Sequence, residues 1–441
     1  MAKISMVSLG CPKNLVDAEM MLEALKNDGY EITPYENEAD VIIVNTCGFI
    51  EDAKREAIEN ILECANYKTE GNLKALVVTG CLAERYRDEI AEQFPEVDAV
   101  VGIGKNGNIA EIVKKTLNGE KGRYYGKKTE LDICAPRMVS TPHYTAYIKI
   151  AEGCSNCCTY CAIPAIRGRF RSRPMESIVK EAQKLAANGV KELIVIAQDT
   201  TRYGEDIYGE QKLPELLGEL CGIDGIEWIR TLYTYPDRID DKLINTVARE
   251  PKLCKYFDIP IQHCNETVLR RMNRKGDRKS LTALMEKIRA AIPNVTLRTT
   301  LITGFPGETE EQFCELCEFV NEVKFDRLGC FPYSPEEGTP AADYPDQIDD
   351  QVKSDRAENI MNDQLRIVNE KNEAKIGSTV KVLVEGYDNY IKCWFGRSEA
   401  DAPDIDGKVF FMSSKELTVG DFQNVTVNDT IEYDLLGEAT E

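Results

Sequence analysis

Six of the sixteen cysteines in this chain fall into two sets of three, and this pattern constrains the fold and the chemistry more than any other feature. The compact set lies in the segment GCSNCCTYC and consists of Cys154, Cys158 and Cys161. The dispersed set follows three separate strand-like runs and consists of Cys11, Cys47 and Cys81. A closed structural zinc site takes four ligands. Three thiolates in each set therefore suit a reactive site that keeps one position open.

The length and the cysteine usage indicate a cytoplasmic protein of several domains. A chain of 441 residues is long enough for roughly three domains of about 150 residues each. No run approaches about 18 uninterrupted apolar residues and no signal-peptide pattern is present, so we expect a soluble, cytoplasmic protein with no membrane partner. That compartment keeps thiols reduced, which favours metal ligands or buried cysteines over disulfides. Only His143 and His263 are present, so sulfur is the expected metal ligand.

The charge of the chain argues against a nucleic-acid partner. The net charge is -21 and the isoelectric point is near 4.8. Nonspecific adhesion to nucleic acid depends on Lys and Arg that neutralise phosphates, so tRNA is an unlikely partner for so acidic a chain. We expect a basic or neutral partner instead.

Residues 1–125 alternate strand and helix patterns and predict an open, parallel α/β sheet. Apolar residues recur at helical spacing after Cys11, and Gly29 is a plausible stop for that helix. The runs Val41–Val44 and Leu76–Val78 are continuously apolar, as expected of central parallel strands. Ligands of such sheets gather outside the carboxyl ends of the strands. Three βα loops can therefore bring the dispersed cysteines to one point.

Residues 126–142 are polar and predict a linker or strap. Residues 143–376, which follow, predict a partial barrel of six βα units. Six units are too few for the eight of a closed (β/α) barrel. A long charged helix, from Gln351 to about Lys375, closes this region. The six strands are expected at Tyr147–Ala151, Glu192–Ala197, Trp228–Tyr233, Tyr256–Ile261, Thr296–Thr303 and Arg327–Tyr333.

Residues 377–441 change to short alternating runs separated by Gly, Asp and Pro. The runs STVKVLVEGY, YIKCWFGRS, GKVFFMS and NDTIEYDLL predict a small antiparallel β-barrel, similar to a TRAM domain. From Ser378 onward this region holds 5 Lys and Arg against 13 Asp and Glu, a net charge of -8. So acidic a barrel suits a basic protein partner, although a merely solvating role for the charge is the alternative.

The compact set resembles the cluster loop of radical S-adenosylmethionine (SAM) enzymes, because C-x3-C-x2-C follows a strand and opens a βα repeat. The resemblance implies that Cys154, Cys158 and Cys161 hold a 4Fe-4S cluster whose fourth iron binds the amino and carboxylate groups of SAM. The alternative is a zinc knot that also uses Cys157, although structural zinc sites usually take two ligands from a distant segment. Cys157 is in any case a competing thiol inside the loop.

Further segments resemble SAM contacts of the same superfamily. Gln198 and Asp199 follow the second strand of the predicted barrel. The segment TTLITGFPGE is similar to the G-x-I-x-G-x-x-E element that packs on the adenine, and it matches at Ile302 and Gly304. Its acid, Glu308, comes one place late. The candidates for SAM binding are therefore Gln198, Asp199, Ile302 and Gly304, and no catalytic side chain is identified.

Over essentially its whole length the chain resembles the methylthiotransferases, which join a three-cysteine α/β domain, a radical barrel and a C-terminal β-barrel. The resemblance implies a second 4Fe-4S cluster on Cys11, Cys47 and Cys81, whose open iron carries the sulfur to be inserted. It implies two SAM molecules, one to methylate that sulfur and one to make the radical, together with an external electron donor and a sulfur donor. Judged by residue type alone, three buried cysteines are the alternative for the dispersed set.

Four segments are similar to the branch of this family that modifies an aspartate β-carbon in ribosomal protein S-twelve. They are SLGCPKN, CAIPAIRGRFRSRP, QDTTRYGEDIYG and GRSEADAPDIDG. The branch that modifies tRNA adenosine typically carries a GCQMN-type loop at the first cysteine. A tRNA methylthiotransferase is therefore the second hypothesis, and a metal-binding module without catalysis is the third.

Overall fold

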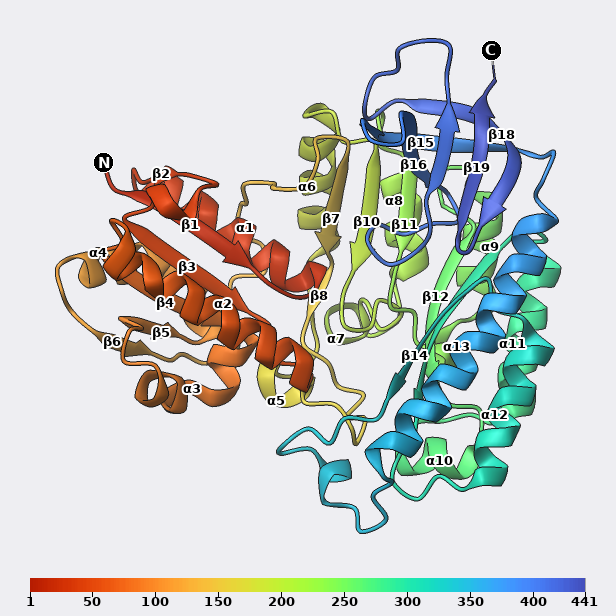
Figure 1. The fold of residues 1–441 in the computed structure, drawn as a ribbon, viewed down its shortest axis with the longest axis horizontal. Coiled ribbons are helices and arrows are strands. Elements are labelled where there is room, and N and C mark those ends of the chain that lie inside the picture. The colour runs from red at the N-terminus through yellow and green to blue at the C-terminus, as the bar shows by residue number, and fades with distance from the viewer. Residues whose placement is uncertain (441) are drawn as a thin grey trace.

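Three folded regions follow one another along the chain in the computed structural model, which describes residues 1–440 (Figure 1). The N-terminal region lies beside the central one, and the C-terminal barrel covers one end of the central strands. The architecture is mixed α/β with a closed barrel at the C-terminus, as the sequence predicts. No helix in the described part of the chain has both the length and the hydropathy to cross a membrane.

The N-terminal region is a six-stranded parallel sheet in the order β2-β1-β3-β4-β5-β6. Its helices lie on both faces, with α1 and α4 over one and α2 and α3 over the other. Every residue of β3 and β4 is buried, which explains their continuous apolar runs. The strands are β1 (Lys3–Ser8), β2 (Glu31–Ile32), β3 (Val41–Thr46), β4 (Ala75–Gly80), β5 (Ala99–Val101) and β6 (Gly122–Tyr124). The helices are α1 (Pro12–Asn27), α2 (Glu51–Glu70), α3 (Cys81–Gln93) and α4 (Ile109–Leu117).

The segment between the first two regions is held in place by one buried arginine. Apart from a 3₁₀ turn, η3 (Lys128–Glu130), it has no regular structure before β7. Arg137 pairs with Glu19 of α1 and, at 2.7 Å, with Glu181 of helix α6 in the central region. The segment therefore straps the two regions together rather than linking them loosely.

The central region is an arc of six parallel strands in two hydrogen-bonded groups, β7-β10-β11 and β12-β13-β14. The backbone of Thr234 donates to the carbonyl of Asp258 at 2.9 Å and joins the two groups. The strands are β7 (Thr145–Lys149), β10 (Glu192–Ile196), β11 (Trp228–Thr231), β12 (Tyr256–Gln262), β13 (Thr296–Thr303) and β14 (Arg327–Pro332). A short pair, β8 (Ala151–Glu152) with β9 (Arg171–Ser172), flanks the cysteine loop.

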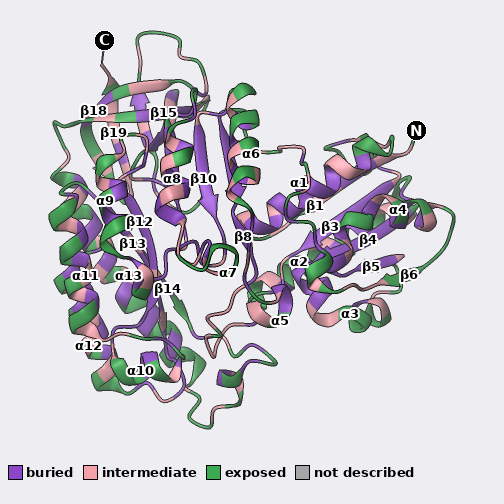
Figure 2. Cartoon of the chain, turned by 180° about the vertical axis from the view of Figure 1, so that it is seen from behind, coloured by how far each residue is buried: buried purple, intermediate pink, exposed green. Residues whose placement is uncertain are grey.

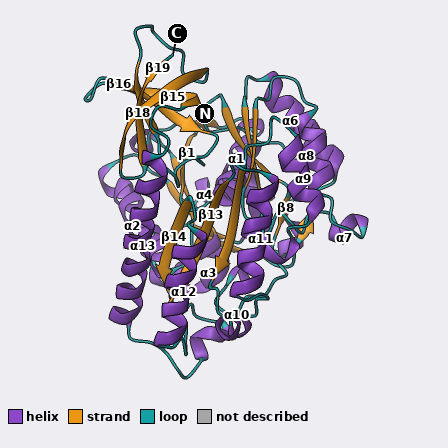
Figure 3. Cartoon of the chain, turned by 90° about the vertical axis from the view of Figure 1, so that its right-hand side faces the viewer, coloured by secondary structure: helices purple, strands orange, loops and turns teal. Residues whose placement is uncertain are grey.

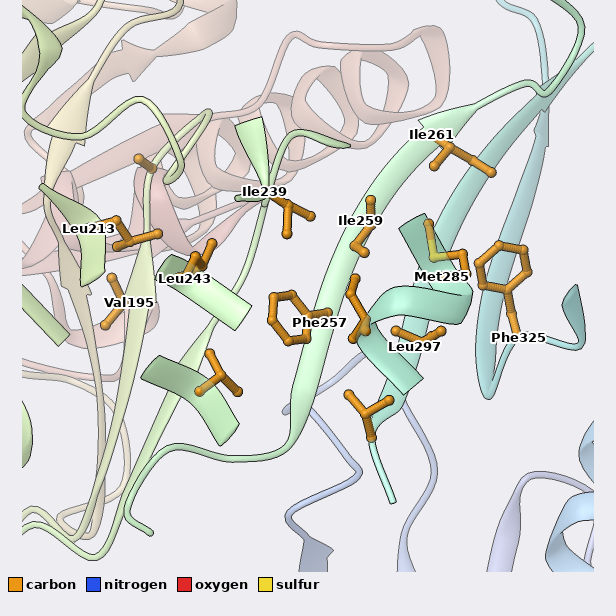
Figure 4. Packing of buried hydrophobic residues seen from close by; sticks show 14 of the residues in the cluster. Val195, Leu213, Ile239, Leu243, Phe257, Ile259, Ile261, Met285, Leu297 and Phe325 are labelled. Atoms are coloured by element: carbon orange, nitrogen blue, oxygen red, sulfur yellow. The ribbon is translucent and has the colours of Figure 1, made fainter. Parts of the chain in front are cut away.

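Helices cover the outside of the arc, and their apolar faces build the main core. Figure 4 shows Phe257 and Ile259 of β12 with Leu297 of β13 beside Met285 of a covering helix. Helices α11, α12 and α13 form an outer layer over β13 and β14 (Figure 3) and expose their far sides (Figure 2). The helices are α5 (Ile163–Arg167), α6 (Met175–Ala187), α7 (Glu205–Tyr208), α8 (Leu213–Cys221), α9 (Asp241–Arg249), α10 (Glu266–Arg271), α11 (Arg278–Ala291), α12 (Glu310–Val323) and α13 (Asp350–Glu373).

The C-terminal region is a closed five-stranded barrel in the order β15-β16-β17-β19-β18. All neighbours are antiparallel except β17 and β19, which pair in parallel. The run NDTIEYDLL, expected as one strand, is divided by a turn at Glu432, whose φ of 51° ends β18. The strands are β15 (Thr379–Asp388), β16 (Cys393–Ser398), β17 (Val409–Met412), β18 (Phe422–Ile431) and β19 (Asp434–Ala439).

Buried charges fix the barrel to the central strands. Glu192 of β10 lies between two arginines, Arg230 of β11 at 3.2 Å and Arg397 of β16 at 2.6 Å. A second pair joins Arg327 of β14 to Asp401 at 2.5 Å. These contacts hold the barrel over the end of the arc where the strands begin, opposite the end that carries the cysteine loop.

Candidate functional site

The three dispersed cysteines lie at one edge of the N-terminal sheet. Cys11 immediately precedes α1, Cys47 follows β3, and Cys81 begins α3 directly after β4. Strands β1, β3 and β4 are neighbours, so their carboxyl ends bring these three loops together. The packing there is close: a Cβ added to Gly10, whose φ is +87°, would lie 3.0 Å from the Cys47 sulfur. A glycine is therefore required where the first loop passes the second.

The dispersed thiols share one electrostatic environment. Burial raises the pKa of Cys81 to about 12, although the neighbouring Arg167 opposes this, and Cys11 and Cys47 are both close enough to raise it further. Burial also raises the pKa of Cys47. Without a metal these two thiols hold their protons at neutral pH. Metal binding must expel the protons, which an iron cluster achieves by coordinating the thiolates.

The compact cysteines lie in a loop between β8 and α5. The loop begins at Gly153, where φ is +77° and an added Cβ would meet the Arg169 carbonyl at 2.4 Å. The Cys154 amide donates to the carbonyl of Gly168 at 3.0 Å. Burial raises the pKa of Cys154 to about 11 and that of Cys161 further, and neighbouring thiols of the set raise both. The Cys158 sulfur lies 3.8 Å from the hydroxyl of Tyr235 and 3.8 Å from Nη1 of Arg274.

Cys157 differs from its neighbours in the loop. Its side chain is exposed, its φ is +53°, and its carbonyl accepts a hydrogen bond from the Asn273 side chain at 2.9 Å. Cys154, Cys158 and Cys161 are all partly buried. Within residues 1–440 no three His, Cys, Asp or Glu side chains converge at the spacing of a single bound ion. Three thiols that are close enough to raise one another's pKa, in a loop that begins at a left-handed glycine, suit the ligands of a 4Fe-4S cluster.

Gln198 and Asp199 lie beside the compact loop but are mostly occupied by protein contacts. Asp199 is fully buried and accepts hydrogen bonds from Asn156 at 2.8 Å and from Thr201 at 2.5 Å. Since Asn156 belongs to the cysteine loop, Asp199 positions that loop. Gln198 donates to Glu152 at 3.4 Å, while its buried Oε1 has no hydrogen-bond partner among residues 1–440. That oxygen is free to accept a bond from a ligand.

Ile302 and Gly304 lie at the end of β13 but face different surroundings. Ile302 lines a cavity of about 650 Å³ at the ends of β12, β13 and β14. The amide of Gly304 donates to both carboxylate oxygens of Glu308 at 3.1 and 3.0 Å. Glu308, the acid that comes one place late in the sequence, thus stabilises the turn by accepting from the Gly304 amide. Gly304 consequently shapes the turn, and its amide hydrogen is already donated to Glu308 and is not available to a nucleotide.

The same cavity is bordered by chain neighbours of both sets of cysteines, a relation that the sequence does not predict. Its wall includes Phe49, two residues after Cys47, and Tyr160, which immediately precedes Cys161. On the central region it is lined by Gln262, Thr300, Phe331, Pro332 and Tyr333. The apolar side chains Phe49, Ile50 and Phe331 are 36 to 53% exposed at its rim. A ligand in this cavity would therefore meet groups next to both triplets.

A buried charge network joins the two cysteine sites. Arg167, at the end of α5, donates to Asn14 at 3.0 Å, to the sulfur of Cys81 at 3.3 Å, and to Asp17 of α1. Lys149 of β7 pairs with Asp17 and, at 2.8 Å, with Glu152. Burial opposes ionisation of Glu152, yet Lys149 and Arg167 lower its pKa to about 2. None of these contacts was predicted from the sequence.

Comparison with known families divides the chain in the same way as the structure. Residues 3–102 match Uncharacterized protein family UPF0004, residues 148–320 match the Radical SAM superfamily, and residues 376–440 match the TRAM domain. The solved structure of TsrM, a radical SAM methyltransferase from Kitasatospora setae with cobalamin and a 4Fe-4S cluster bound, is similar in fold. Its TM-score is 0.56 at 15% identity, with 77% of each chain covered.

Curated relatives are similar over the full length. The ribosomal protein uS12 (S-twelve) methylthiotransferase RimO of Pelotomaculum thermopropionicum is 53% identical, with 99% of each chain covered. The protein of the same name from Desulforamulus reducens is 51% identical, again over 99% of each chain. That from Geobacter sulfurreducens is 51% identical over 99% of this chain and 98% of its own. The chain therefore belongs to the RimO family of radical SAM methylthiotransferases.

Proposed function

We propose that this chain replaces a β-carbon hydrogen of an aspartate in ribosomal protein uS12 with a methylthio group and uses two SAM molecules to do so. The relatives that share about half of its residues over their full length are named ribosomal protein uS12 methylthiotransferases. One structural observation supports the proposal above the others. A single cavity of about 650 Å³ is bordered by neighbours of Cys47 and of Cys161. A substrate carbon placed there would be close to both proposed clusters.

We assign one 4Fe-4S cluster to each triplet, with Cys154, Cys158 and Cys161 for SAM cleavage and Cys11, Cys47 and Cys81 for sulfur insertion. When bound, the two clusters would supply an electron to split the SAM sulfonium and a site that carries the sulfur. The fit rests on the chemistry of the donors. Each set offers three grouped thiols, and beside each set a left-handed glycine, Gly10 or Gly153, lets the cysteine loop pack closely against a neighbouring segment.

Side chains at the two cysteine sites and in the cavity have separate tasks in this proposal. Asp199 holds the compact loop through Asn156, and the unpartnered Oε1 of Gln198 accepts a bond from the SAM ammonium group. Ile302 supplies an apolar wall for the nucleoside. Arg167 fixes the dispersed site relative to the compact loop by binding Cys81 and Asp17 together. The exposed apolar rim at Phe49, Ile50 and Phe331 is covered when the substrate loop enters, which excludes water from the radical.

The charge distribution supports a protein substrate over tRNA. The C-terminal barrel carries a net charge of -8 from Ser378 to Glu441, which attracts a basic ribosomal protein and repels a phosphate backbone. The reaction further needs an electron donor and a sulfur donor from outside the chain. A ribosomal protein substrate places the enzyme in the cytoplasm.

The decisive experiment offers the anaerobically reconstituted enzyme, in parallel, to recombinant uS12 and to unmodified tRNA. Mass spectrometry should find a methylthio group in place of one hydrogen on the uS12 aspartate and no change in the tRNA. About one S-adenosylhomocysteine, from the SAM that gives its methyl group, and about one 5′-deoxyadenosine, from the SAM that is cleaved, should form per methylthiolated uS12. Modified tRNA with unmodified uS12 would overturn the proposal in favour of the second hypothesis. Bound zinc with no 5′-deoxyadenosine would support a non-catalytic module instead.

A further inference from the structure

A second hollow, of about 270 Å³, lies on the compact cysteine loop and is lined largely by cations. Its wall includes Ser155 and Asn156 of the loop. Around them stand five basic side chains and a single carboxylate, that of Asp237. The cations are Arg202, Arg238, Arg270, Arg274 and Lys275. Such a concentration is unusual in a chain with a net charge of -21. We call these ten-residue surroundings the basic hollow.

Part of this positive charge is free to meet a partner. Glu205 pairs with Arg202 at 3.5 Å and with Arg238 at 3.3 Å and neutralises one side of the hollow. Arg270 is 69% exposed and its nearest carboxylate, on Glu266, is 3.9 Å away. Lys275 is exposed and forms no ion pair with any residue in the described part of the chain. The free cations therefore lie on the segment 270–275.

That same segment is bonded directly to the cysteine loop. The side chain of Asn273 donates to the carbonyls of Asn156 at 3.2 Å and Cys157 at 2.9 Å. The amide of Thr159 donates to the carbonyl of Met272 at 3.1 Å. The exposed Cys157 marks the place where the loop reaches the surface. The basic hollow is thus a charged surface that is hydrogen-bonded, through Asn273, to the backbone between Cys154 and Cys158.

The basic hollow is separate from the cavity assigned to SAM and the substrate. The two share no lining residue, and the cavity opens between α2 and the ends of β12 to β14. A partner bound at the hollow would leave that cavity accessible. An electron could therefore enter from one side of the loop while the substrate occupies the other.

We propose that the basic hollow docks a small acidic protein that carries a one-electron redox group. This inference rests on the proposed function, because it supplies the electron that SAM cleavage consumes. In each docking event the reduced donor loses one electron and the cluster on Cys154, Cys158 and Cys161 gains it, with no bond formed or broken at the surface. Opposite charges steer such an encounter and orient it. A long nucleic acid would instead be repelled by the rest of this acidic chain.

The test compares two charge reversals of equal size in the reconstituted enzyme. The first is Arg270→Glu with Lys275→Glu in the basic hollow. The second is Lys180→Glu with Lys184→Glu, two exposed residues on α6, which changes the net charge by the same amount elsewhere. The probe is a purified acidic flavodoxin, and dithionite serves as a reductant that needs no docking surface. Binding, and 5′-deoxyadenosine formation with each reductant, are measured at low and high salt.

We expect the hollow variant to bind flavodoxin about tenfold more weakly at low salt and to lose most of the salt dependence of binding. The α6 variant should bind almost as the unchanged enzyme does, and dithionite should support equal cleavage in all three. Equal flavodoxin affinity in the hollow variant and in the unchanged enzyme would overturn the inference. Methylthiolation of uS12 driven by dithionite reports on the proposed function separately, so the two can fail independently.

Discussion

The guanidinium of Arg167 donates a hydrogen bond to the sulfur of Cys81 at 3.3 Å, although the two residues are 86 positions apart. Arg167 follows the compact cysteine loop, and Cys81 belongs to the dispersed set. The same guanidinium pairs with Asp17 of the N-terminal region and, at 3.3 Å, with Glu152 of the central region. One fully buried cation thus fixes the spacing of the two cysteine sites.

Replacing Arg167 with glutamine should destabilise the protein by about 3 to 5 kcal/mol, because two buried carboxylates lose a partner. Urea unfolding of the metal-free protein measures this change. The matched control is Arg169→Gln, an exposed arginine two positions along the chain, for which we expect a change within about 0.5 kcal/mol. If both variants unfold at the same urea concentration, Arg167 does not hold the two regions together.

The pH dependence of stability should reflect Glu192 at the junction with the barrel. Burial alone would raise its pKa, but Arg397 and Arg230 lower it from the ordinary 4.5 to about 2. A carboxyl with a lowered pKa in the folded state stabilises the fold above pH 4.5 and loses that contribution as the pH falls toward 2. The loss from this group should approach about 3 kcal/mol.

Glu192→Gln tests that assignment, since it removes the titration and leaves two buried arginines short of a partner. We expect a lower free energy of unfolding at pH 7 and a shallower decline of that free energy between pH 4.5 and 2. Urea unfolding at each pH measures both. Glu227→Gln serves as the control because its carboxylate is 52% exposed and pairs only with Lys381. An unchanged pH profile in Glu192→Gln would assign the acid sensitivity to other carboxylates, such as Glu152.

The position of the dispersed cysteines could be predicted because it depends on the backbone alone. Parallel strands end at a common edge, so residues that directly follow β1, β3 and β4 must be neighbours. Strands β3 and β4 could be predicted because they are buried on both faces, which makes their sequences continuously apolar. The barrel was predictable from its alternating runs, whereas the turn at Glu432 was hidden inside one apparent strand.

The side-chain partners could not be predicted, because they depend on how distant segments pack. Asp199 was expected near SAM, but the structure directs it to Asn156 of the cysteine loop. The arginines that alternate after the loop also differ in their surroundings. Arg167 and Arg173 are buried against carboxylates of the protein itself, while Arg169 is exposed. Neither outcome is encoded in the spacing of the run.

The two cysteine sets should separate the two half-reactions. Cys158→Ala should abolish SAM cleavage and leave about one 4Fe-4S cluster per chain. Cys47→Ala should leave the same iron content and retain cleavage, but should insert no sulfur. Iron analysis, 5′-deoxyadenosine formation and the mass of uS12 measure the three quantities. Cys314→Ala, an exposed cysteine on α12, should change none of them. Full methylthiolation by Cys47→Ala would refute the second cluster.

Gly304→Ala should weaken SAM binding without loss of iron. The glycine has φ +69°, and an added Cβ would lie 2.2 Å from Cγ and 3.1 Å from Cα of Lys353, so the turn after Ile302 must move. Such strain costs about 1 to 3 kcal/mol and shifts the cavity wall that Ile302 supplies. Gly107→Ala is the control, since nothing lies within 4 Å of its added Cβ. Equilibrium dialysis of SAM and iron analysis give the two readouts. If Gly304→Ala binds SAM as tightly as Gly107→Ala does, the end of β13 is not part of the nucleoside site. The contact with the nucleoside must then be assigned to Phe331 and Tyr333, which line the same cavity.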